Sequence, residues 1–395
     1  MADLLSIDEA QRLILERARP LAPEAVPVSE AAGRILAAAA TSLVDLPPFD
    51  SSAMDGYAVR AADTPGRLRV TGRVAAGRPA DAGLEPRGAM GIATGGEVPA
   101  GADAVVPIEL VVESTDAVEV PPAEPGANVR PRGGDLRSGA VVAAAGERGT
   151  PARLGALAAA GVAEVSCARR PRVAVVPTGT ELRKPGERLG RGEVYEANGL
   201  ILEAQLAATG ALVTREDAVG DDEAQHRAVL ERALELDAVV TSGGVSVGPH
   251  DLVRRVEAEL GVEEVFWRVA VKPGKPISFG VRGATLVFGL PGNPVSALVG
   301  FELFVRPAIL ALQGAAEPLP AFEAGRLAVP RRRNPHRDEL VRARRALDAG
   351  GAILEPLSGQ ESHMIARAAA ADALVLVPRG EGEIAAGAAV QYLRL

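Results

Sequence analysis

Cysteine, histidine and aromatic residues are scarce in this sequence of 395 residues. The single cysteine, Cys167, cannot form an intrachain disulfide, which excludes a disulfide-stapled scaffold and fits a reducing compartment. We expect Cys167 to be a small buried residue on a strand. Four histidines and one cysteine argue against a zinc site. Only 3% of the residues are aromatic, so hydrophobic cores must be built from alanine, valine and leucine.

Long apolar runs and excess positive charge are also missing. No uninterrupted apolar run approaches the roughly 20 residues that span a bilayer. Acidic residues close to the start of the chain do not fit a secretory signal. The net charge of −8 argues against broad nucleic-acid binding. With 47% hydrophobic and 24% charged residues, the composition predicts a cytoplasmic globular protein that acts on a small ligand, without membrane or nucleic-acid partners.

Two helical patterns flank a different kind of sequence in the first part of the chain. Ser6 and Glu9 have the spacing of a capping box, so we expect a helix over residues 6–18 and a second helix over 28–40. A helical pattern returns over residues 148–162. Together these segments predict a helical linker and dimerisation domain. It is made of residues 1–42 and 139–170.

Between the helical segments, proline and glycine recur every few residues among short β-rich runs. Residues 69–74 and 104–112 are two such runs. This pattern is typical of a small β domain with ordered loops. We therefore expect a β-rich domain, residues 43–138, inserted into the helical linker. Short strands return at the end of the chain, so residues 317–395 predict a second, C-terminal small β domain.

Residues 171–316 alternate short apolar strands with helices. The expected strands begin near residues 172, 211, 237 and 284, and the expected helices cover 198–209, 223–236, a segment from about 251, and 295–312. Uninterrupted apolar strands between helices indicate a parallel sheet that is covered on both faces. The chain is thus predicted to be a multidomain α/β protein with a three-layer, doubly wound parallel-sheet domain.

Four polar loops follow the expected strands of this sheet. They are PTGTEL (177–182), GDD (220–222), TSGGVSVGPHD (241–251) and LPGNPVS (290–296). Ligands of such sheets bind beyond the carboxyl ends of the strands, where all four loops should meet. Their convergence points to a ligand site more strongly than any single loop does.

TSGGVSVGPHD has the glycines of a phosphate cradle but not the Gly-Lys-Ser/Thr ending of a nucleotide-triphosphate loop. Gly243 and Gly244 would let the backbone approach a ligand, and Ser242 and Ser246 add hydroxyl donors. Backbone N–H groups before the next helix would form an anion seat. The alternative is an ordinary strand-to-helix loop in which Asp251 caps the helix.

Three carboxylates, those of Glu181, Asp221 and Asp251, each follow a strand end and should face one crevice. Two carboxylates about 4 Å apart repel by several kcal/mol at an effective dielectric of about 20. The cluster therefore needs a proton, a cation or a wider spacing. Mg2+ beside a phosphorylated ligand meets this need, because it bridges carboxylate and phosphate oxygens. Separate helix caps and surface acids are the alternative.

Positive charge comes from the loop VKPGKP, which carries Lys272 and Lys275 between two prolines. A rigid loop presents ammonium groups at lower entropic cost, as oxyanion binding favours. The loop LPGNPVS adds further candidates. They are Pro291, Asn293, Pro294 and Ser296. Solvated lysines at a turn, and an ordinary strand-to-helix turn, are the alternatives.

Taken together, these segments resemble the molybdopterin molybdenumtransferases, a family known as MoeA in bacteria and as the E domain of gephyrin in animals. The resemblance is carried in order by DLPPFDSSAMDGYAVR, ATGGEVPAGADAVVPIE, GANVRPRGGD, PTGTEL, EANGLILEAQL, TSGGVSVGPHD, VKPGKP and LPGNPVS. It spans nearly the whole chain and is weakest over residues 320–395. Any one block could be coincidental, whereas eight in the same order could not.

The resemblance implies a fold, a reaction and partners. The fold is an elongated homodimer of four-domain subunits whose parallel-sheet domain binds the pterin. The reaction is the Mg2+-dependent insertion of molybdate into the dithiolene of adenylylated molybdopterin, with loss of AMP. Molybdate and adenylylated molybdopterin are the implied substrates. The molybdopterin adenylyltransferase and recipient molybdoenzymes are the implied protein partners.

The resemblance also implies roles for individual residues. The β-rich domain would contribute Asp55, Asp135 and Thr94, the first two as catalytic residues. The parallel-sheet domain would contribute the catalytic residues Glu181, Asp251, Lys272 and Lys275, with Asp221 joining Glu181 and Asp251 at the metal. Substrate would be bound by Thr178, Gly179, Ser242, Gly243, Gly244, Ser246, Pro291, Asn293, Pro294 and Ser296. Lys272, Ser296, Arg342 and Ser362 are the candidates for molybdate, and Lys275 for the pterin phosphate.

Two other functions stay open. A molybdopterin adenylyltransferase shares the parallel-sheet domain and a similar TSGG loop, but a stand-alone member would lack residues 1–150. A non-catalytic scaffold of the gephyrin E type would not need the charged residues. Tungstate could replace molybdate, because the two oxyanions match in charge and nearly in size. The linker helices, taken as rigid spacers, further predict a site shared between two subunits.

Overall fold

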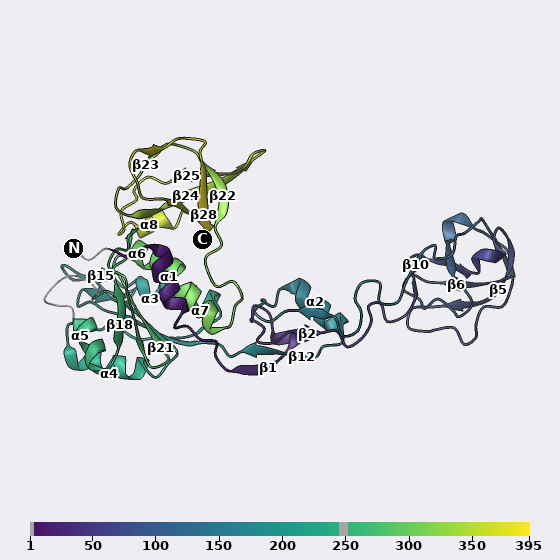
Figure 1. Ribbon diagram of the computed structural model, residues 1–395, viewed down its shortest axis with the longest axis horizontal. Helices are drawn as coiled ribbons and strands as arrows, with labels where there is room; N and C mark the ends of the chain where they lie inside the picture. The colour runs from purple at the N-terminus through teal and green to yellow at the C-terminus, as the bar shows by residue number, and fades with distance from the viewer. Residues whose placement is uncertain (1–3, 245–251) are drawn as a thin grey trace.

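The computed structural model describes residues 4–244 and 252–395. The chain is elongated, with a parallel-sheet region and a C-terminal barrel at one end, a linker in the middle and a β-rich region at the other end (Figure 1). Two residues that the sequence assigns to the ligand site, Ser246 and Asp251, lie outside the described residues.

The parallel-sheet region contains a six-stranded sheet in the order β16-β13-β17-β21-β20-β18. Its first four strands are parallel, as expected. They are β16 (Leu212–Arg215), β13 (Arg172–Pro177), β17 (Ala238–Ser242) and β21 (Thr285–Leu290). Two antiparallel strands that the sequence analysis does not predict, β20 (Ser278–Arg282) and β18 (Glu263–Trp267), extend the sheet. A register shift between Glu264 and Phe266 interrupts the alternation of inward and outward side chains along β18, so the sequence lacks the regular pattern of a strand there.

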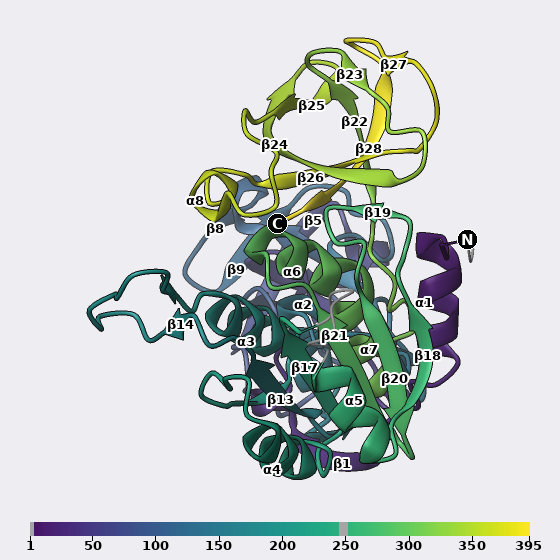
Figure 2. The same ribbon diagram turned by 90° about the vertical axis from the view of Figure 1, so that its left-hand side faces the viewer.

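Helices cover both faces of this sheet, so the predicted three layers are confirmed (Figure 2). Along β13, Val173 and Val175 pack with the helices of one layer, and Ala174 and Val176 pack with those of the other. The first layer includes α3 (Asn198–Ala208), and the second consists of α4 (Glu223–Ala233) and α5 (Leu252–Glu259). Burial of both faces explains why these strands are continuous apolar runs.

A continuous helical segment follows β21 as α6 (Pro294–Gly300), the π-helical turn η4 (Phe301–Val305) and α7 (Arg306–Leu312). By length and composition this segment could cross a membrane, but 78% of it is buried inside the protein. Its two charges pair with each other, because Arg306 Nε donates to Glu302 Oε2 at 2.5 Å. The segment is therefore a core helix of the parallel-sheet region.

Helix α1 (Ile7–Leu15) begins with the predicted capping box. Ser6 Oγ accepts a hydrogen bond from Glu9 N at 3.2 Å, and Ser6 N donates to Glu9 Oε2 at 2.8 Å. The buried residues Ile7 and Ile14 pack in the same core as η4 and α7. The helix therefore packs on the parallel-sheet region, although the sequence analysis places it in the linker.

The predicted helix over residues 28–40 is wrong. Only a 3-10 turn, η1 (Val28–Glu30), forms there, and Gly33 then takes a φ of +74°. Ile35 and Leu36 instead form isolated bridges to other segments of the linker and are buried. Tertiary pairing thus overrides the helical pattern of these apolar residues.

Paired strands make up much of the linker, so the expectation of helical spacers is also wrong. Strand β1 (Pro23–Pro27) runs antiparallel to β12 (Glu164–Ala168), and β2 (Ala40–Thr41) pairs with β11 (Val141–Ala143). Helix α2 (Pro151–Ala159), capped by Thr150, lies within the predicted helix 148–162. Cys167 is buried on β12, as expected, and burial raises the pKa of its thiol.

The β-rich region contains a six-stranded sheet in the order β7-β4-β6-β5-β9-β8. Its strands are β4 (Gly56–Val59), β5 (Gly66–Val74), β6 (Gly88–Ile92), β7 (Ala104–Pro107), β8 (Val112–Glu113) and β9 (Ala117–Val120). Tyr57 and Val59 of β4 enter one hydrophobic core, and Ala58 enters another. The predicted strand 104–112 is divided in two, because the 3-10 turn η3 (Ile108–Leu110) interrupts it.

The C-terminal region is a small barrel. Strands β24 (Asp338–Asp348), β25 (Gly351–Pro356), β22 (Glu323–Leu327), β28 (Ala389–Arg394) and β26 (Ala373–Val377) are neighbours in that order, and β26 pairs back with β24. Strand β19 (Val271–Lys272) of the parallel-sheet region pairs with β24 in parallel, with Val271 opposite Asp338. The two regions therefore share one sheet.

Asp237 ties the N-terminal ends of two central strands together. Arg169 donates to its two carboxylate oxygens at 2.6 and 2.7 Å, and Arg172 N donates at 2.7 Å. Burial raises the pKa of Asp237, but these hydrogen bonds outweigh the burial, so its pKa lies below the ordinary value. The charged form of Asp237 thus stabilises the fold.

We predict that Asp237→Asn lowers the free energy of unfolding by about 2 kcal/mol at neutral pH, because hydrogen bonds to a charged group are lost. A depressed folded pKa contributes stability above the unfolded pKa, and this stability is lost as the pH falls through the folded pKa. The difference between wild type and variant, measured by urea unfolding, should therefore shrink in acid. As a control, Asp217→Asn removes an exposed pair with Lys184 and should cost less than about 1 kcal/mol. Equal effects of the two substitutions would contradict this assignment.

Candidate active site

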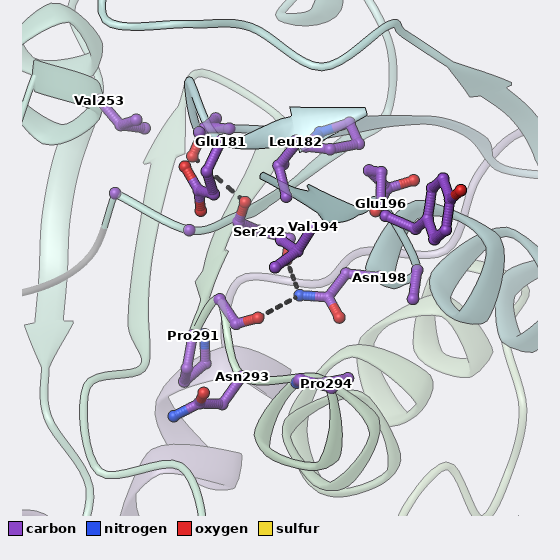
Figure 3. A pocket seen from close by; sticks show the side chains of 18 of the residues that line it. Glu181, Leu182, Val194, Glu196, Asn198, Ser242, Val253, Pro291, Asn293 and Pro294 are labelled. Carbon is purple, nitrogen blue, oxygen red and sulfur yellow. Dashed lines mark hydrogen bonds between the residues drawn. The ribbon is translucent and has the colours of Figure 1, made fainter. Parts of the chain in front are cut away.

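A cavity of about 730 Å³ opens at the carboxyl ends of the four parallel strands (Figure 3). Its walls include the loops that follow β13, β16, β17 and β21, so the predicted convergence is present in the structure. Ten of the residues predicted from the sequence line it. They are Thr178, Gly179, Glu181, Asp221, Ser242, Gly243, Gly244, Pro291, Asn293 and Pro294.

Three of the loops meet through their backbones. Thr178 N donates to Ser242 O at 2.9 Å, and Gly243 N donates to Leu290 O at 3.0 Å. Gly243 has a φ of +97°, and a Cβ at this position would lie 2.5 Å from Thr178 O. Glycine is therefore required because the neighbouring loop occupies the space. This reason differs from the close approach of a ligand that the sequence suggests.

Asn198, at the start of α3, connects two of these loops and is not among the residues predicted from the sequence. Its Nδ2 donates to Ser242 Oγ at 2.7 Å and to Gly292 O at 2.8 Å (Figure 3). The side chain is buried. The signal that could have found it is an amide at the first position of a mostly apolar helix, within EANGLILEAQL.

Glu181 and Asp221 reach the cavity from neighbouring loops as exposed carboxylates. Neither forms an ion pair within residues 4–244 and 252–395. A third carboxylate on the wall, that of Glu196, is buried, accepts from Gly199 N at 2.6 Å and lies 3.7 Å from Arg215. Glu196 therefore serves the structure of the wall, and Glu181 and Asp221 stay available to a ligand.

The described lining of the cavity contains no lysine or arginine. An anionic ligand would therefore need a metal ion, or a basic group from elsewhere, to offset its charge. No group of three or more histidine, cysteine, aspartate or glutamate side chains is placed to hold a metal within the described residues. The three-carboxylate cluster stays a prediction, because Asp251 is outside that part of the chain.

His226, on α4, also lines the cavity and is not predicted from the sequence. It is only 2% exposed, and its Nδ1 has no hydrogen-bond partner in the part of the chain that the structure describes. Burial lowers the pKa of His226, although the Gly220 backbone and the nearby Asp221 carboxylate act in the opposite direction.

The C-terminal barrel contributes His363 and Ile365 to the cavity wall, at the start of helix α8 (Ile365–Ala368). Arg342 holds the preceding loop, because its guanidinium donates to three backbone carbonyls. The acceptors are Met364 O at 2.9 Å, Gly359 O at 2.8 Å and Glu361 O at 3.1 Å. Arg342 is 1% exposed, and burial lowers its pKa. This guanidinium therefore positions the loop that leads to His363, and its contact with molybdate stays a prediction.

Ser362 and Ser296 are the other candidates for molybdate, and Ser362 takes part in the contact between the barrel and α6. Val295 N donates to Ser362 O at 3.1 Å. The Ser296 side chain is buried within α6. Neither serine is among the described residues that line the cavity. Their contact with an oxyanion stays a prediction.

The two lysines of VKPGKP also lie outside the described lining of the cavity. Lys272 Nζ contacts the buried Glu339 carboxylate, which also lies 3.4 Å from Arg331. Lys272 therefore helps to join β19 to β24. Lys275 is exposed, and its backbone carbonyl accepts from Val269 N at 3.1 Å. Their roles toward molybdate and the pterin phosphate stay predictions.

The three sequence blocks of the β-rich region converge on a second surface. Strand β3 (Ser51–Ser52) pairs with β10 (Val129–Arg130), and Ser52 N donates to Gly96 O at 2.9 Å. The Asp55 carboxylate accepts from Thr94 N at 2.7 Å and from Thr94 Oγ1 at 2.9 Å. These two hydrogen bonds hold the pKa of Asp55 below its ordinary value.

Asp135 is exposed on the third block, and its backbone N–H donates to Leu46 O at 2.9 Å. The predicted residues Asp55, Thr94 and Asp135 thus belong to one assembly of loops. Within one chain, however, the β-rich region lies at the opposite end of the long axis from the parallel sheet and its cavity (Figure 1). A single chain therefore does not bring these residues to Glu181 and Asp221.

We predict that Asn198→Ala weakens ligand binding at the cavity by about 3- to 30-fold, since two hydrogen bonds that position the loops are lost. Asn198→Asp should not restore binding, because a carboxylate cannot donate to Gly292 O. Calorimetric titration with the ligand of the cavity measures the effect. The matched control is Gln205→Ala, which removes another amide of α3 whose Nε2 donates to Glu302 away from the cavity. Unchanged binding by both Asn198 variants would contradict this role.

Three family models match consecutive parts of the chain. They describe the MoeA N-terminal region (domain I and II) over residues 5–161, a probable molybdopterin binding domain over 174–311, and the MoeA C-terminal region (domain IV) over 324–395. The order of these matches follows the order of the regions described above.

Relatives and solved structures match over the same length. The chain is 38% identical to molybdopterin molybdenumtransferase 2 of Mycobacterium tuberculosis, over 98% of both chains. It is 39% identical to the molybdopterin molybdenumtransferase of Haemophilus influenzae, over 79% of this chain and 78% of that one. The crystal structure of the molybdopterin biosynthesis MoeA protein of Pyrococcus horikoshii OT3 matches with a TM-score of 0.85, 28% identity and 100% coverage of both chains. The chain therefore belongs to the molybdopterin molybdenumtransferase family, the MoeA family.

Proposed function

We propose that this chain, as a member of a family of molybdenum cofactor biosynthesis, inserts molybdate into adenylylated molybdopterin with Mg2+ and releases AMP. The observation that carries the proposal is the cavity at the ends of the parallel strands. It is lined by the carboxylates of Glu181 and Asp221, which form no ion pair with any residue that the structure describes, and its described lining has no lysine or arginine. A phosphorylated ligand together with Mg2+ satisfies both features.

The donor set fits Mg2+. This ion takes oxygen ligands, keeps several waters, and is commonly held by one or two carboxylates together with substrate phosphates. Glu181 and Asp221 would supply the carboxylates, and Asp251 is proposed as the third. When bound, the ion would supply positive charge to the phosphate oxygens of the ligand.

The rest of the cavity would position the ligand. The reaction breaks a bond between two phosphates, so fixed geometry and charge neutralisation are sufficient and no covalent intermediate is needed. The Asn293 side chain makes no capping hydrogen bond at α6 and lines the cavity, so it is available to the ligand. Asn198 would keep the Ser242 and Gly292 loops in place during the reaction.

We predict that Asp221→Asn raises the Mg2+ concentration needed for half-maximal AMP release by about 10- to 100-fold, because the metal loses a carboxylate ligand. The measurement is AMP release from adenylylated molybdopterin in titrations of Mg2+ and molybdate. Asp222→Asn is the matched control. The Asp222 side chain caps α4 by accepting from Gln225 N at 3.1 Å, and asparagine caps helices equally well.

The same assay separates the alternatives. Identical Mg2+ titrations for Asp221→Asn and Asp222→Asn would remove Asp221 from the metal site. Formation of adenylylated molybdopterin from ATP and molybdopterin would identify an adenylyltransferase. A folded protein without either activity would be a scaffold. Parallel titrations with tungstate would establish which oxyanion is preferred.

We further propose that each active site is shared between the two subunits of a homodimer. The support is the separation, within one chain, of the Asp55 and Asp135 assembly from the cavity (Figure 1). A twofold arrangement would place the β-rich region of one subunit over the cavity of the other. Basic residues beside Asp135 in RPRGGDLR would then add positive charge to a cavity whose described lining has none.

A mixed dimer tests the shared site. One subunit carries Asp55→Asn and the other carries Glu181→Gln with Asp221→Asn, and each homodimer is expected to be inactive. In a shared arrangement, one of the two sites in a mixed dimer has an intact β-rich region and an intact cavity. AMP release should therefore return to about half of the wild-type rate per dimer. No recovery, with mixed dimers shown to be present, would overturn the shared arrangement.

A further inference from the structure

The β-rich region carries exposed apolar side chains directly beside Asp55. Ile108 and Leu110 of η3 and Val112 of β8 are 43%, 62% and 68% exposed. Ile108 N donates to Asp55 O at 3.0 Å, so these side chains border the residue that is proposed for the shared site. Scattered exposed apolar residues are ordinary on proteins, whereas a contiguous group indicates a binding surface. We call residues 108–112 the apolar segment.

The apolar segment lies in an acidic part of the chain. Residues 108–124 contain no lysine, arginine or histidine. Their acidic residues are Glu109, Glu113, Asp116, Glu119 and Glu124. Tyr57 donates a hydrogen bond to Glu113. Glu109, which lies between Ile108 and Leu110, is exposed and forms no ion pair with the residues that the structure describes. The segment therefore presents an unpaired carboxylate among apolar side chains.

A second exposed apolar group borders the cavity at the other end of the chain. Strands β14 (Leu182–Arg183) and β15 (Val194–Tyr195) pair with each other, and the chain between them projects from the parallel-sheet region (Figure 2). We call residues 182–195 the β14–β15 ribbon. Leu182 and Val194 are opposite each other in it, and both line the cavity (Figure 3). Val194 is 50% exposed. This side of the cavity therefore also has apolar surface without a cover.

The projecting part of the β14–β15 ribbon is basic. Arg183, at its base, forms an ion pair with Glu193. Arg188 and Arg191 are exposed and form no ion pair within residues 4–244 and 252–395. Leu189 lies between them and is 38% exposed. The ribbon therefore combines unpaired positive charge with apolar side chains, and so complements the apolar segment in both respects.

We propose that the apolar segment of one subunit docks on the β14–β15 ribbon of a second copy of the chain, with Glu109 facing Arg188 and Arg191 of the partner subunit. A second copy is the favoured occupant because each surface is continuous with one half of a divided site. One twofold arrangement would cover both surfaces and bring Asp55 to the cavity. Complementary charges would fix the register of this contact. The docking rests on the proposed shared site and identifies the contact that closes it.

A charge swap tests the contact. Glu109→Arg alone, or Arg188→Glu together with Arg191→Glu, places like charges opposite each other. Each should lower kcat/KM for AMP release from adenylylated molybdopterin by about 3- to 30-fold. All three substitutions in one chain restore opposite charges between subunits and should recover most of the activity. The losses should shrink in about 1 M salt, because ions screen exposed charges. Glu381→Arg, on an exposed part of the barrel, is the matched control and should leave kcat/KM unchanged.

Cross-linking gives a measurement that does not depend on activity. A chain with Glu109→Cys and Arg191→Cys, treated with a short bismaleimide, should give covalently joined subunits on a denaturing gel. Each single substitution is the control, and the native Cys167 is buried. The apolar part is tested by Leu110→Ser, which should also lower kcat/KM. Leu347→Ser, at a similarly exposed position of the barrel, should not.

The outcomes separate this contact from the shared site itself. The mixed dimer of Asp55 and cavity variants reports whether the site is shared. If that dimer regains activity, but the charge-reversed chains keep wild-type kcat/KM or are not rescued by the combined swap, the docking contact is overturned alone. The absence of a cross-link between positions 109 and 191 would overturn it in the same way. If the mixed dimer regains no activity, the shared site fails and the docking contact fails with it.

Discussion

The absence of space for a side chain at Gly243 is the constraint on which the site depends. The loops after β13, β17 and β21 come within backbone hydrogen-bond distance here, and a Cβ would meet Thr178 O at 2.5 Å. Each loop can therefore take up its position only if the others are in place. Asn198 adds side-chain hydrogen bonds to the same junction. The ligand thus meets a wall that is assembled before binding, which reduces the entropy lost when it binds.

The cavity is assembled from parts of the chain that are distant in sequence. The parallel sheet supplies its floor and its carboxylates, and the C-terminal barrel supplies His363 and Ile365. Arg342 lies inside the barrel and determines where His363 is placed, because its guanidinium fixes the loop that leads to His363. A residue without contact to the cavity can therefore determine its shape.

Patterns that depend on local chemistry were predictable from the sequence. The capping box of α1, the apolar parallel strands and the convergence of their loops follow from spacing and periodicity, and the structure contains all three. Residues 28–40 did not follow their pattern, because Ile35 and Leu36 are buried by pairing with segments more than 100 residues away. Strand β18 escaped prediction because a bulge shifts its alternation.

The residues of the candidate site also separate into those that the sequence reveals and those that it does not. Glu181 and Asp221 follow strand ends, which motif reasoning detects. Asn198 begins α3 and His226 lies in the first turn of α4, so both look like ordinary helical residues in the sequence. Their importance comes from the loops and the cavity wall that they meet only in the folded chain. For Lys272 the sequence suggests a free cation, but the buried Glu339 carboxylate is its partner across β19 and β24. A carboxylate 67 positions away cannot be anticipated from the VKPGKP loop.

The pairing of β19 with β24 has a consequence for how the chain can be divided. Strand β19 belongs to the parallel-sheet region in sequence but pairs with β24 of the barrel. A domain boundary near residue 317 therefore separates the two regions in sequence, although they share a sheet. A fragment without the barrel would keep Lys272 without its counter-charge and β19 without its partner. A fragment with only the barrel would expose the end of β24 and leave Glu339 facing solvent or an intruding strand. Exchange of this C-terminal region between relatives would therefore succeed only if the strand and its lysine were transferred with it.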